Sequence, residues 1–169
     1  EAMTQVFDKT FLGGLADAKK MVKKSISYVC IVPQAKEDKH LEVLFHDPEY
    51  RCLYKEMKDE AREASKMRLI LPECADYIES QHKEGRAVMV FCRWGQSRSA
   101  TVVISYLMLK HRRTLHDAFW LVRGKRSVAF PNVGFFRMLQ DLDKELYGRL
   151  SMDESRGEYL SINLNNMHK

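Results

Sequence analysis

Residues 87–109 read Ala87-Val88-Met89-Val90-Phe91-Cys92-Arg93-Trp94-Gly95-Gln96-Ser97-Arg98-Ser99-Ala100-Thr101-Val102-Val103-Ile104-Ser105-Tyr106-Leu107-Met108-Leu109. Residues 87–91 are too few for a helix and too apolar for a surface, which predicts a central strand buried on both faces. Residues 98–111 are apolar almost all round, which predicts a buried helix. The loop between them carries a cysteine, a glycine and an arginine. This order of elements is typical of a phosphate-binding loop with a thiol at its base.

The loop suits the cleavage of a phosphomonoester through a covalent intermediate, which needs a nucleophile, donors for the phosphoryl oxygens and an acid for the leaving group. Cys92 supplies the thiol, and Gly95 supplies the backbone freedom of a tight turn. Main-chain N–H groups at the helix start can bind the anion, and Arg98 can hold two of its oxygens at once. The alternative is a core thiol followed by a surface cation. The placement between a buried strand and a buried helix favours the phosphate site.

The composition is that of one soluble globular domain, with 169 residues, 45% of them hydrophobic and 30% charged. No apolar run approaches the roughly 20 residues that span a bilayer, and the N-terminus does not resemble a secretory signal. We therefore expect a cytoplasmic or nuclear protein without a membrane span.

The four cysteines, at positions 30, 52, 74 and 92, match neither a zinc site nor a disulfide framework. We expect no metal site and interpret Cys30 and Cys74 as core thiols.

The net charge of +5 favours an anionic partner. Much of it comes from a group of cations between positions 110 and 126 that has one acidic residue, Asp117, among them: Lys110, Arg112, Arg113, Arg123, Lys125 and Arg126. These cations form either a solvated helix face or a basic rim that guides phosphorylated or acidic ligands. Nucleic acid is disfavoured because aromatic residues do not alternate with the basic ones. The sequence does not indicate an oligomeric state.

The remaining pattern predicts strands that alternate with helices, and therefore a layered α/β fold. We expect short strands up to Gly13-Gly14, a strand at 27–32, a loop at 34–39, one or two strands at 41–57, helices at 16–24, 72–85, 114–123 and 134–147, and a loosely ordered polar tail over 151–169. The start of the 72–85 helix stays open, because a start near Ser65 would place Pro72 in its interior. Thr114 is expected to cap the helix that follows it, and Gly148 to end the last one.

The segment Cys92-Arg93-Trp94-Gly95-Gln96-Ser97-Arg98-Ser99 resembles the signature Cys-x-x-Gly-x-Ser-Arg-Ser of the dual-specificity protein phosphatases. The similarity extends over residues 5–148 and includes Phe11 to Ala18, Ala75 to Ile78, Ser105 to Met108, Thr114 to Ala118 and Pro131 to Phe136. The similarity is greatest to the small atypical members of this family. The resemblance implies a protein tyrosine phosphatase-like fold over residues 1–150, with three layers and a central, mostly parallel sheet. It also implies phosphoprotein substrates and no cofactor.

The resemblance assigns roles to individual residues. Cys92 would be the nucleophile that forms a phosphocysteine, Arg98 would bind the phosphate, and Ser99 would stabilise the departing thiolate. Asn132 would brace the phosphate loop. The main-chain N–H groups that bind phosphate would come from Arg93, Trp94, Gly95, Gln96 and Ser97. Arg93 and Trp94 are unusual residues for this loop, and their roles are inferred from their side chains alone: Trp94 would either form a wall for an aromatic phosphoresidue or pack on a neighbouring loop, and Arg93 would attract acidic substrates.

The chain departs from the family at two places. The family usually has histidine directly before the nucleophile, but here the residue is Phe91, which cannot hydrogen-bond to the loop; we expect slower turnover in an intact site. The family's general acid is an aspartate in an upstream loop, and alignment places Ala61 there. We choose Asp59 as the acid and Glu60 as the second candidate, the alternative being that both are solvated loop charges.

The expected function is therefore that of a phosphatase, active on phosphotyrosine and also on phosphoserine or phosphothreonine in proteins. The alternative is a pseudophosphatase that binds phosphoproteins with negligible turnover. A phosphoinositide or RNA phosphate ranks last, because the loop does not resemble the Lys-rich or Thr-Gly-ending loops of those relatives.

Overall fold

A five-stranded sheet forms the centre of the computed structural model, which describes residues 3–153. Its strands are β1 (Thr4–Phe7), β2 (Thr10–Gly13), β3 (Ile26–Cys30), β4 (Arg51–Tyr54) and β5 (Ala87–Phe91), in the order β1-β2-β5-β3-β4. Only β1, at one edge, is antiparallel to its neighbour. The predicted central strand, β5, therefore lies in the middle of a mostly parallel sheet.

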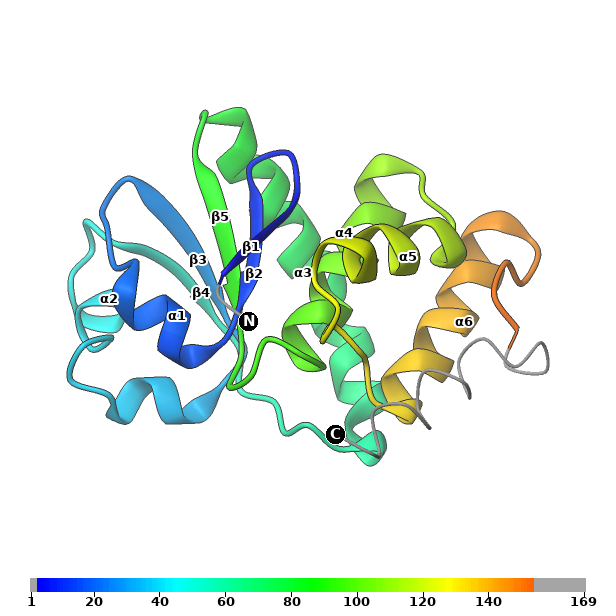
Figure 1. The fold of residues 1–169 in the computed structure, drawn as a ribbon, viewed down its shortest axis with the longest axis horizontal. Coiled ribbons are helices and arrows are strands. Elements are labelled where there is room, and N and C mark those ends of the chain that lie inside the picture. Colours follow the sequence, from blue (N-terminus) through cyan, green and yellow to red (C-terminus); the bar gives the residue numbers. More distant parts are fainter. Residues whose placement is uncertain (1–2, 154–169) are drawn as a thin grey trace.

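Helices cover both faces of the sheet (Figure 1). The short helices α1 (Leu15–Lys20) and α2 (Val43–His46) lie on one side, and α3 (Ala64–Lys83), α4 (Arg98–His111), α5 (Leu115–Lys125) and α6 (Val133–Tyr147) lie on the other. Two cores fill the space between the layers. Val88 and Val90 of β5 belong to the larger core, under α3 to α6, whereas Met89 and Phe91 belong to the smaller one. The predicted α/β fold with three layers is confirmed.

Helices α5 and α6 begin at residues whose side chains cap them, and α6 ends at a glycine. The Thr114 hydroxyl accepts a hydrogen bond from Asp117 N at 3.2 Å, as the sequence predicts. The side chain of Asn132 caps α6 by accepting one from Phe135 N at 2.9 Å. Gly148, with φ +71°, ends α6, also as predicted.

Three local predictions are corrected. Of the one or two strands predicted at 41–57, one is present as β4, whereas residues 43–46 form helix α2, whose Leu44 is buried in the smaller core together with Leu41. The helix predicted at 16–24 ends at Lys20, where the Tyr28 hydroxyl holds the turning chain by accepting a hydrogen bond from Lys23 N at 2.8 Å. The loop predicted at 34–39 contains a 3₁₀ turn, Pro33–Glu37. The open question about α3 is settled in favour of the early start, and Pro72 lies inside the helix.

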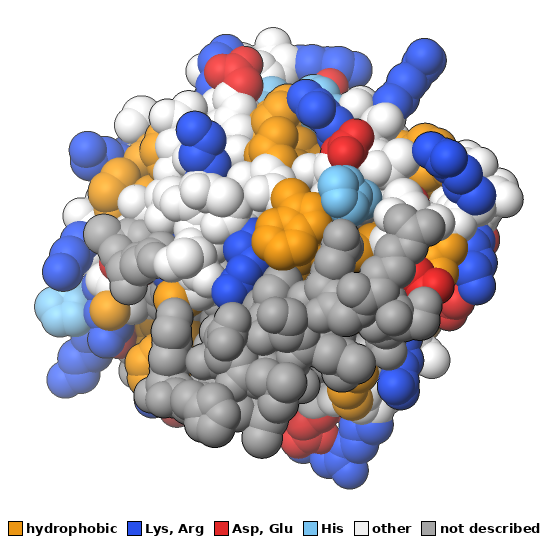
Figure 2. Space-filling model, turned by 45° about the vertical axis from the view of Figure 1, so that its right-hand side comes forward, with side chains coloured by type: hydrophobic (Ala, Val, Ile, Leu, Met, Phe, Trp, Pro, Cys, Tyr) orange, Lys and Arg blue, Asp and Glu red, His pale blue; other side chains and the backbone are white. Residues whose placement is uncertain are grey.

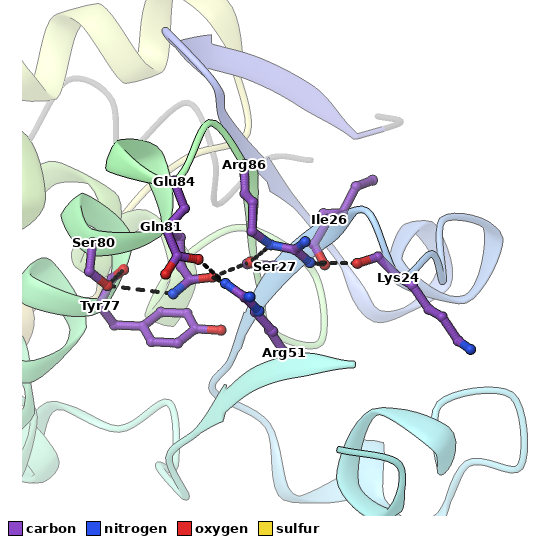
Figure 3. Close-up of polar contacts among 9 residues, drawn as sticks. All are labelled: Lys24, Ile26, Ser27, Arg51, Tyr77, Ser80, Gln81, Glu84 and Arg86. Carbon is purple, nitrogen blue, oxygen red and sulfur yellow. Dashed lines mark hydrogen bonds and ion pairs between the residues drawn. The ribbon is translucent and has the colours of Figure 1, made fainter. Parts of the chain in front are cut away.

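A polar network ties the end of α3 to the beginnings of the parallel strands (Figure 3). The Ser27 hydroxyl donates to Gln81 Oε1 at 2.6 Å, and Arg86 Nε donates to the same hydroxyl at 2.8 Å. Arg51 Nη1 reaches Gln81 Oε1 at 3.2 Å. The network fixes the end of the sheet opposite to the carboxyl end of β5, where ligand sites of α/β folds lie.

The predicted tail falls mostly on residues 154–169, which lie outside the described part. The last described residues pack on the domain: the Ser151 hydroxyl donates to Asp143 Oδ2 at 2.7 Å, and Met152 is buried. None of the helices within residues 3–153 is long and apolar enough to cross a membrane.

Candidate active site

The phosphate loop (residues 92–98) joins β5 to α4 and is seated on the end of β2. Gly95 has φ +65°, and a Cβ there would lie 2.5 Å from the Gly13 carbonyl carbon. A Cβ on Gly14 would lie 2.9 Å from Arg93 O. Leu15 N donates to that same oxygen at 3.0 Å. Because Gly95 and Gly14 have no side chain, the backbone of the phosphate loop approaches the backbone of residues 13–15 more closely than a Cβ at either position would allow.

Arg126 braces the phosphate loop from inside the protein. Its side chain is 1% exposed, and its Nε donates to Gly95 O at 2.9 Å and its Nη2 to Trp94 O at 3.3 Å. Holding these carbonyls on one side favours a loop whose N–H groups face the other side, the arrangement that binds anions. This role differs from the surface position that the sequence predicts for Arg126 as one of the cations between positions 110 and 126. Arg126 is the C-cap residue directly after α5, and its partners in the loop are main-chain oxygens, for which the sequence pattern carries no signal.

The predicted group of cations does not form one surface. Besides Arg126, Lys110 pairs with Asp76 at 2.5 Å, and Arg123 donates to Ala129 O at 2.9 Å. Figure 2 shows the side of the molecule on which α5 and α6 lie, with Lys and Arg side chains dispersed over the visible surface and acidic ones between them. On the face that Figure 2 shows, the visible Lys and Arg side chains do not form a single basic rim.

Cys92 lies at the base of the phosphate loop and is 2% exposed. Its Sγ is 3.1 Å from Ser99 Oγ, and both atoms are buried. The hydroxyl can therefore donate a hydrogen bond to a thiolate at this position.

Cys30 and Cys74 are core thiols as predicted, and burial raises the pKa of each to about 12. Burial also raises the pKa of Cys52.

Arg98 combines burial with unused hydrogen-bonding capacity. Its Nη1 donates to Met57 O at 2.8 Å. Its Nε is buried and has no hydrogen-bond partner among the described residues. Leaving such a donor unpaired costs about 1–3 kcal/mol. An oxyanion bound over the phosphate loop would accept from Nε and recover this free energy.

Asn132 connects the phosphate loop to the segment that carries the predicted acid. Its main-chain N donates to Ser97 Oγ at 2.9 Å, and its Nδ2 donates to Asp59 Oδ1 at 2.9 Å. The predicted second candidate, Glu60, instead pairs with Arg62. A Cβ on Gly134 would lie 2.2 Å from Ala61 O, so the acid segment also rests against the start of α6. The structure thus brings Asp59 and Asn132 together beside the phosphate loop and turns Glu60 to another partner.

Phe91 belongs to the smaller core, whereas the next residue, Cys92, belongs to the larger one. The Phe91 ring is fully buried and contacts the Tyr28 ring edge-on, with centroids 6.5 Å apart. Its main-chain O accepts from Ile31 N at 3.1 Å, as in a regular parallel ladder. The phenyl ring therefore contributes packing to the sheet and no hydrogen bond to the phosphate loop.

Arg93 and Trp94 form the exposed outer part of the phosphate loop. The Trp94 side chain is 67% exposed, so it does not pack away on a neighbouring loop. Arg93 Cζ lies 5.0 Å from the centroid of the indole ring. Both side chains line a hollow beside the phosphate loop.

Comparisons with known proteins show the family to which the chain belongs. The family model described as "Dual specificity phosphatase, catalytic domain" matches residues 10–145. "Dual specificity protein phosphatase 1B" of Arabidopsis thaliana is 32% identical over 149 residues, which cover 86% of this chain and 84% of that protein. "Dual specificity protein phosphatase 1" of the same plant is 43% identical over 94 residues, which cover 56% of this chain. The match spans only about half of that relative's length, 48%. The solved structure of human DUSP28 has a TM-score of 0.72 at 26% identity, with 86% of this chain and 95% of that chain covered.

Proposed function

The chain belongs to the dual specificity phosphatase family, and from this premise we propose that it hydrolyses phosphotyrosine, and phosphoserine or phosphothreonine, in proteins through a phosphocysteine intermediate. The observation that carries the proposal is the 3.1 Å contact between Cys92 Sγ and Ser99 Oγ at the base of the phosphate loop. This contact supports the proposal because the reaction needs a thiol nucleophile and a group that stabilises its anion at the start of a buried helix.

In the first step the Cys92 thiolate attacks phosphorus, the S–P bond forms and the P–O bond to the substrate breaks. Arg98 holds two phosphoryl oxygens with Nε and its free Nη group, and loop N–H groups bind the charge that develops. Asp59 delivers a proton to the leaving oxygen. Its hydrogen bond from Asn132 Nδ2 holds the carboxyl beside the phosphate loop.

In the second step water attacks the phosphocysteine. Asp59, now ionised, accepts a proton from the water, and the S–P bond breaks to release inorganic phosphate. Ser99 Oγ donates a hydrogen bond to the departing thiolate. The enzyme returns to its initial state with a protonated Asp59, so the two steps balance.

Phe91 supports the proposal that turnover is slow. A phenyl ring buried against Tyr28 supplies no hydrogen bond that would stabilise the thiolate or the loop. The same observation favours a second candidate function, the binding of phosphoproteins with negligible turnover. Phe91→His discriminates between these ideas: we expect a higher kcat together with a lower free energy of unfolding, by about 1–3 kcal/mol, because a polar ring replaces an apolar one in the core. An unchanged kcat in a folded variant would remove Phe91 as the cause of slow turnover.

The decisive experiment compares hydrolysis of a small aryl phosphate, from about pH 5 to about pH 8, by the wild type and by Cys92→Ser. Cys52→Ser is the matched control, since it removes a thiol outside the phosphate loop. Loss of turnover in Cys92→Ser alone supports the phosphatase. If the wild type shows no turnover but binds a phosphopeptide, and Arg98→Lys weakens that binding, the chain is a phosphoprotein-binding module.

A further inference from the structure

A hollow of about 380 Å³ lies directly beside the phosphate loop, on the side of α1. It is lined by Gly14, Leu15, Ala16, Asp17, Lys19, Arg93 and Trp94. Its position is fixed by backbone contacts, because Leu15 N donates to Arg93 O at 3.0 Å and Gly14 lies against Arg93 O. The hollow and the phosphate loop are thus parts of one rigid backbone arrangement, and a substrate bound by the loop would extend over the hollow.

Of the charged residues that line the hollow, Asp17 and Lys19 are engaged in contacts within the protein, and Arg93 is available to attract an anion. Asp17 Oδ2 accepts a hydrogen bond from Gly14 N at 2.9 Å, so this carboxylate is held at the start of α1. Lys19 is paired with Asp38 at 2.5 Å. The exposed Arg93 guanidinium contacts the Trp94 ring, and within residues 3–153 it has no acidic partner.

The stacking of Arg93 on Trp94 suits a carboxylate ligand. An aromatic face holds a guanidinium by its plane and leaves the N–H groups at its edge for a ligand. A carboxylate takes two such N–H groups in parallel, which gives both strength and orientation. The indole, 67% exposed, adds an apolar surface on which the aliphatic part of an acidic side chain can lie.

We propose that this hollow is a specificity subsite that binds an aspartate or glutamate of the substrate near the phosphoresidue. The inference rests on the proposed function and adds a substrate preference to it. An extended peptide advances about 3.3–3.6 Å per residue, so a residue one or two positions from the phosphoresidue reaches the side chain that directly follows the nucleophile. Arg93 selects the acidic residue, and Trp94 holds Arg93 in position.

The test uses phosphotyrosine peptides that carry either alanine or aspartate at the neighbouring positions on each side. The measured quantity is the ratio of kcat/KM for the acidic peptide to that for the alanine peptide. We expect a ratio of about ten for the wild type, which falls to about one in Arg93→Gln and decreases with added salt. Lys20→Gln is the matched control: it removes an exposed cation of α1 that does not line the hollow, and the ratio should survive. A wild-type ratio near one, or a ratio that Arg93→Gln leaves intact, overturns the proposal.

The failure of this inference is distinguishable from that of the proposed function. A small aryl phosphate has no neighbouring residues, so its hydrolysis tests the chemistry alone. If it is hydrolysed and the peptides show no charge preference, the subsite is refuted and the phosphatase stands. Calorimetric binding of the same peptides to Cys92→Ser, with and without Arg93→Gln, tests the subsite independently of turnover. Equal affinity for the two peptides in Cys92→Ser would refute the subsite there too.

Discussion

Arg98 Nη1 donates a hydrogen bond to the main-chain oxygen of Met57, 2.8 Å away. This bond joins the residue proposed to hold the phosphate to the segment that carries Asp59, two positions further along the chain. Asn132 makes a second connection between the same two parts through Ser97 and Asp59. The phosphate loop and the segment that carries Asp59 are therefore held together before any substrate binds, as the proposed proton transfer from Asp59 would require.

Asp59→Asn is expected to lower kcat about 10²-fold or more for phosphoesters with poor leaving groups, because the proton donor is lost. The effect should shrink for aryl phosphates whose phenolate leaves without protonation. Measuring kcat over a series of leaving groups checks this dependence. Glu60→Gln is the control, since Glu60 pairs with Arg62. Equal losses for good and poor leaving groups, or a larger loss in Glu60→Gln, would assign the acid to another residue.

Asn132 offers a variant that separates capping from catalysis. Asn132→Asp keeps an oxygen acceptor for Phe135 N, so the free energy of unfolding should stay within about 0.5 kcal/mol of the wild type. It also turns an oxygen toward Asp59 where Nδ2 now donates. Two facing carboxylates retain a proton more strongly, so the pH optimum of kcat should move upward. Chemical denaturation and a pH–rate profile measure the two effects. An unchanged profile in a fully folded protein would show that Asn132 does not position the acid.

The sequence carried the information for some elements and not for others, and the difference is physical. β5, the phosphate loop and α4 form one contiguous segment, so strand, glycine and helix signals reinforce one another. Helix α2 was missed because a short apolar run around Leu44 is compatible with either a strand or a helix until the core is known. The role of Arg126 was missed because its partners are main-chain oxygens of Trp94 and Gly95, which no side-chain pattern reveals. The contact between Asn132 and Asp59 depends on the approach of two loops, whereas the resemblance to the family indicated only that Asn132 braces the phosphate loop.

Arg126→Met should impair the phosphate loop through the loss of hydrogen bonds to two loop carbonyls. Together with the hydrogen bond from Nη1 to Thr4 Oγ1 at 3.1 Å, these lost bonds from a charged donor are expected to reduce the free energy of unfolding by about 3 kcal/mol or more. In the fraction that stays folded, affinity for vanadate should fall, because the N–H groups of the loop are no longer held toward the anion. Arg126→Lys keeps the charge but not the fork and should restore stability more than vanadate affinity. Native vanadate affinity in a stable Arg126→Lys would contradict the positioning role.

Alkylation by iodoacetamide near neutral pH is expected to be selective for Cys92 in the folded protein. The pKa of Cys30 and of Cys74 is raised to about 12 by burial, so fewer than about one in a thousand of these thiols is ionised near pH 8. Burial likewise raises the pKa of Cys52. Mass spectrometry of the labelled peptides checks the site, and denaturant should make all four thiols react. Labelling of Cys30 or Cys74 ahead of Cys92 in the native state would contradict this assignment.

Cys92 is proposed to carry the phosphoryl group during turnover. Rapid acid quenching of the wild type with an aryl phosphate, followed by mass spectrometry of the peptide that contains Cys92, tests whether it does. We expect a phosphoryl adduct on Cys92 that appears within the first turnover and is absent from Cys92→Ser, which should release no phosphate. Steady hydrolysis by Cys92→Ser, or wild-type turnover without any phosphoryl adduct on Cys92, would show that the thiol is not the nucleophile.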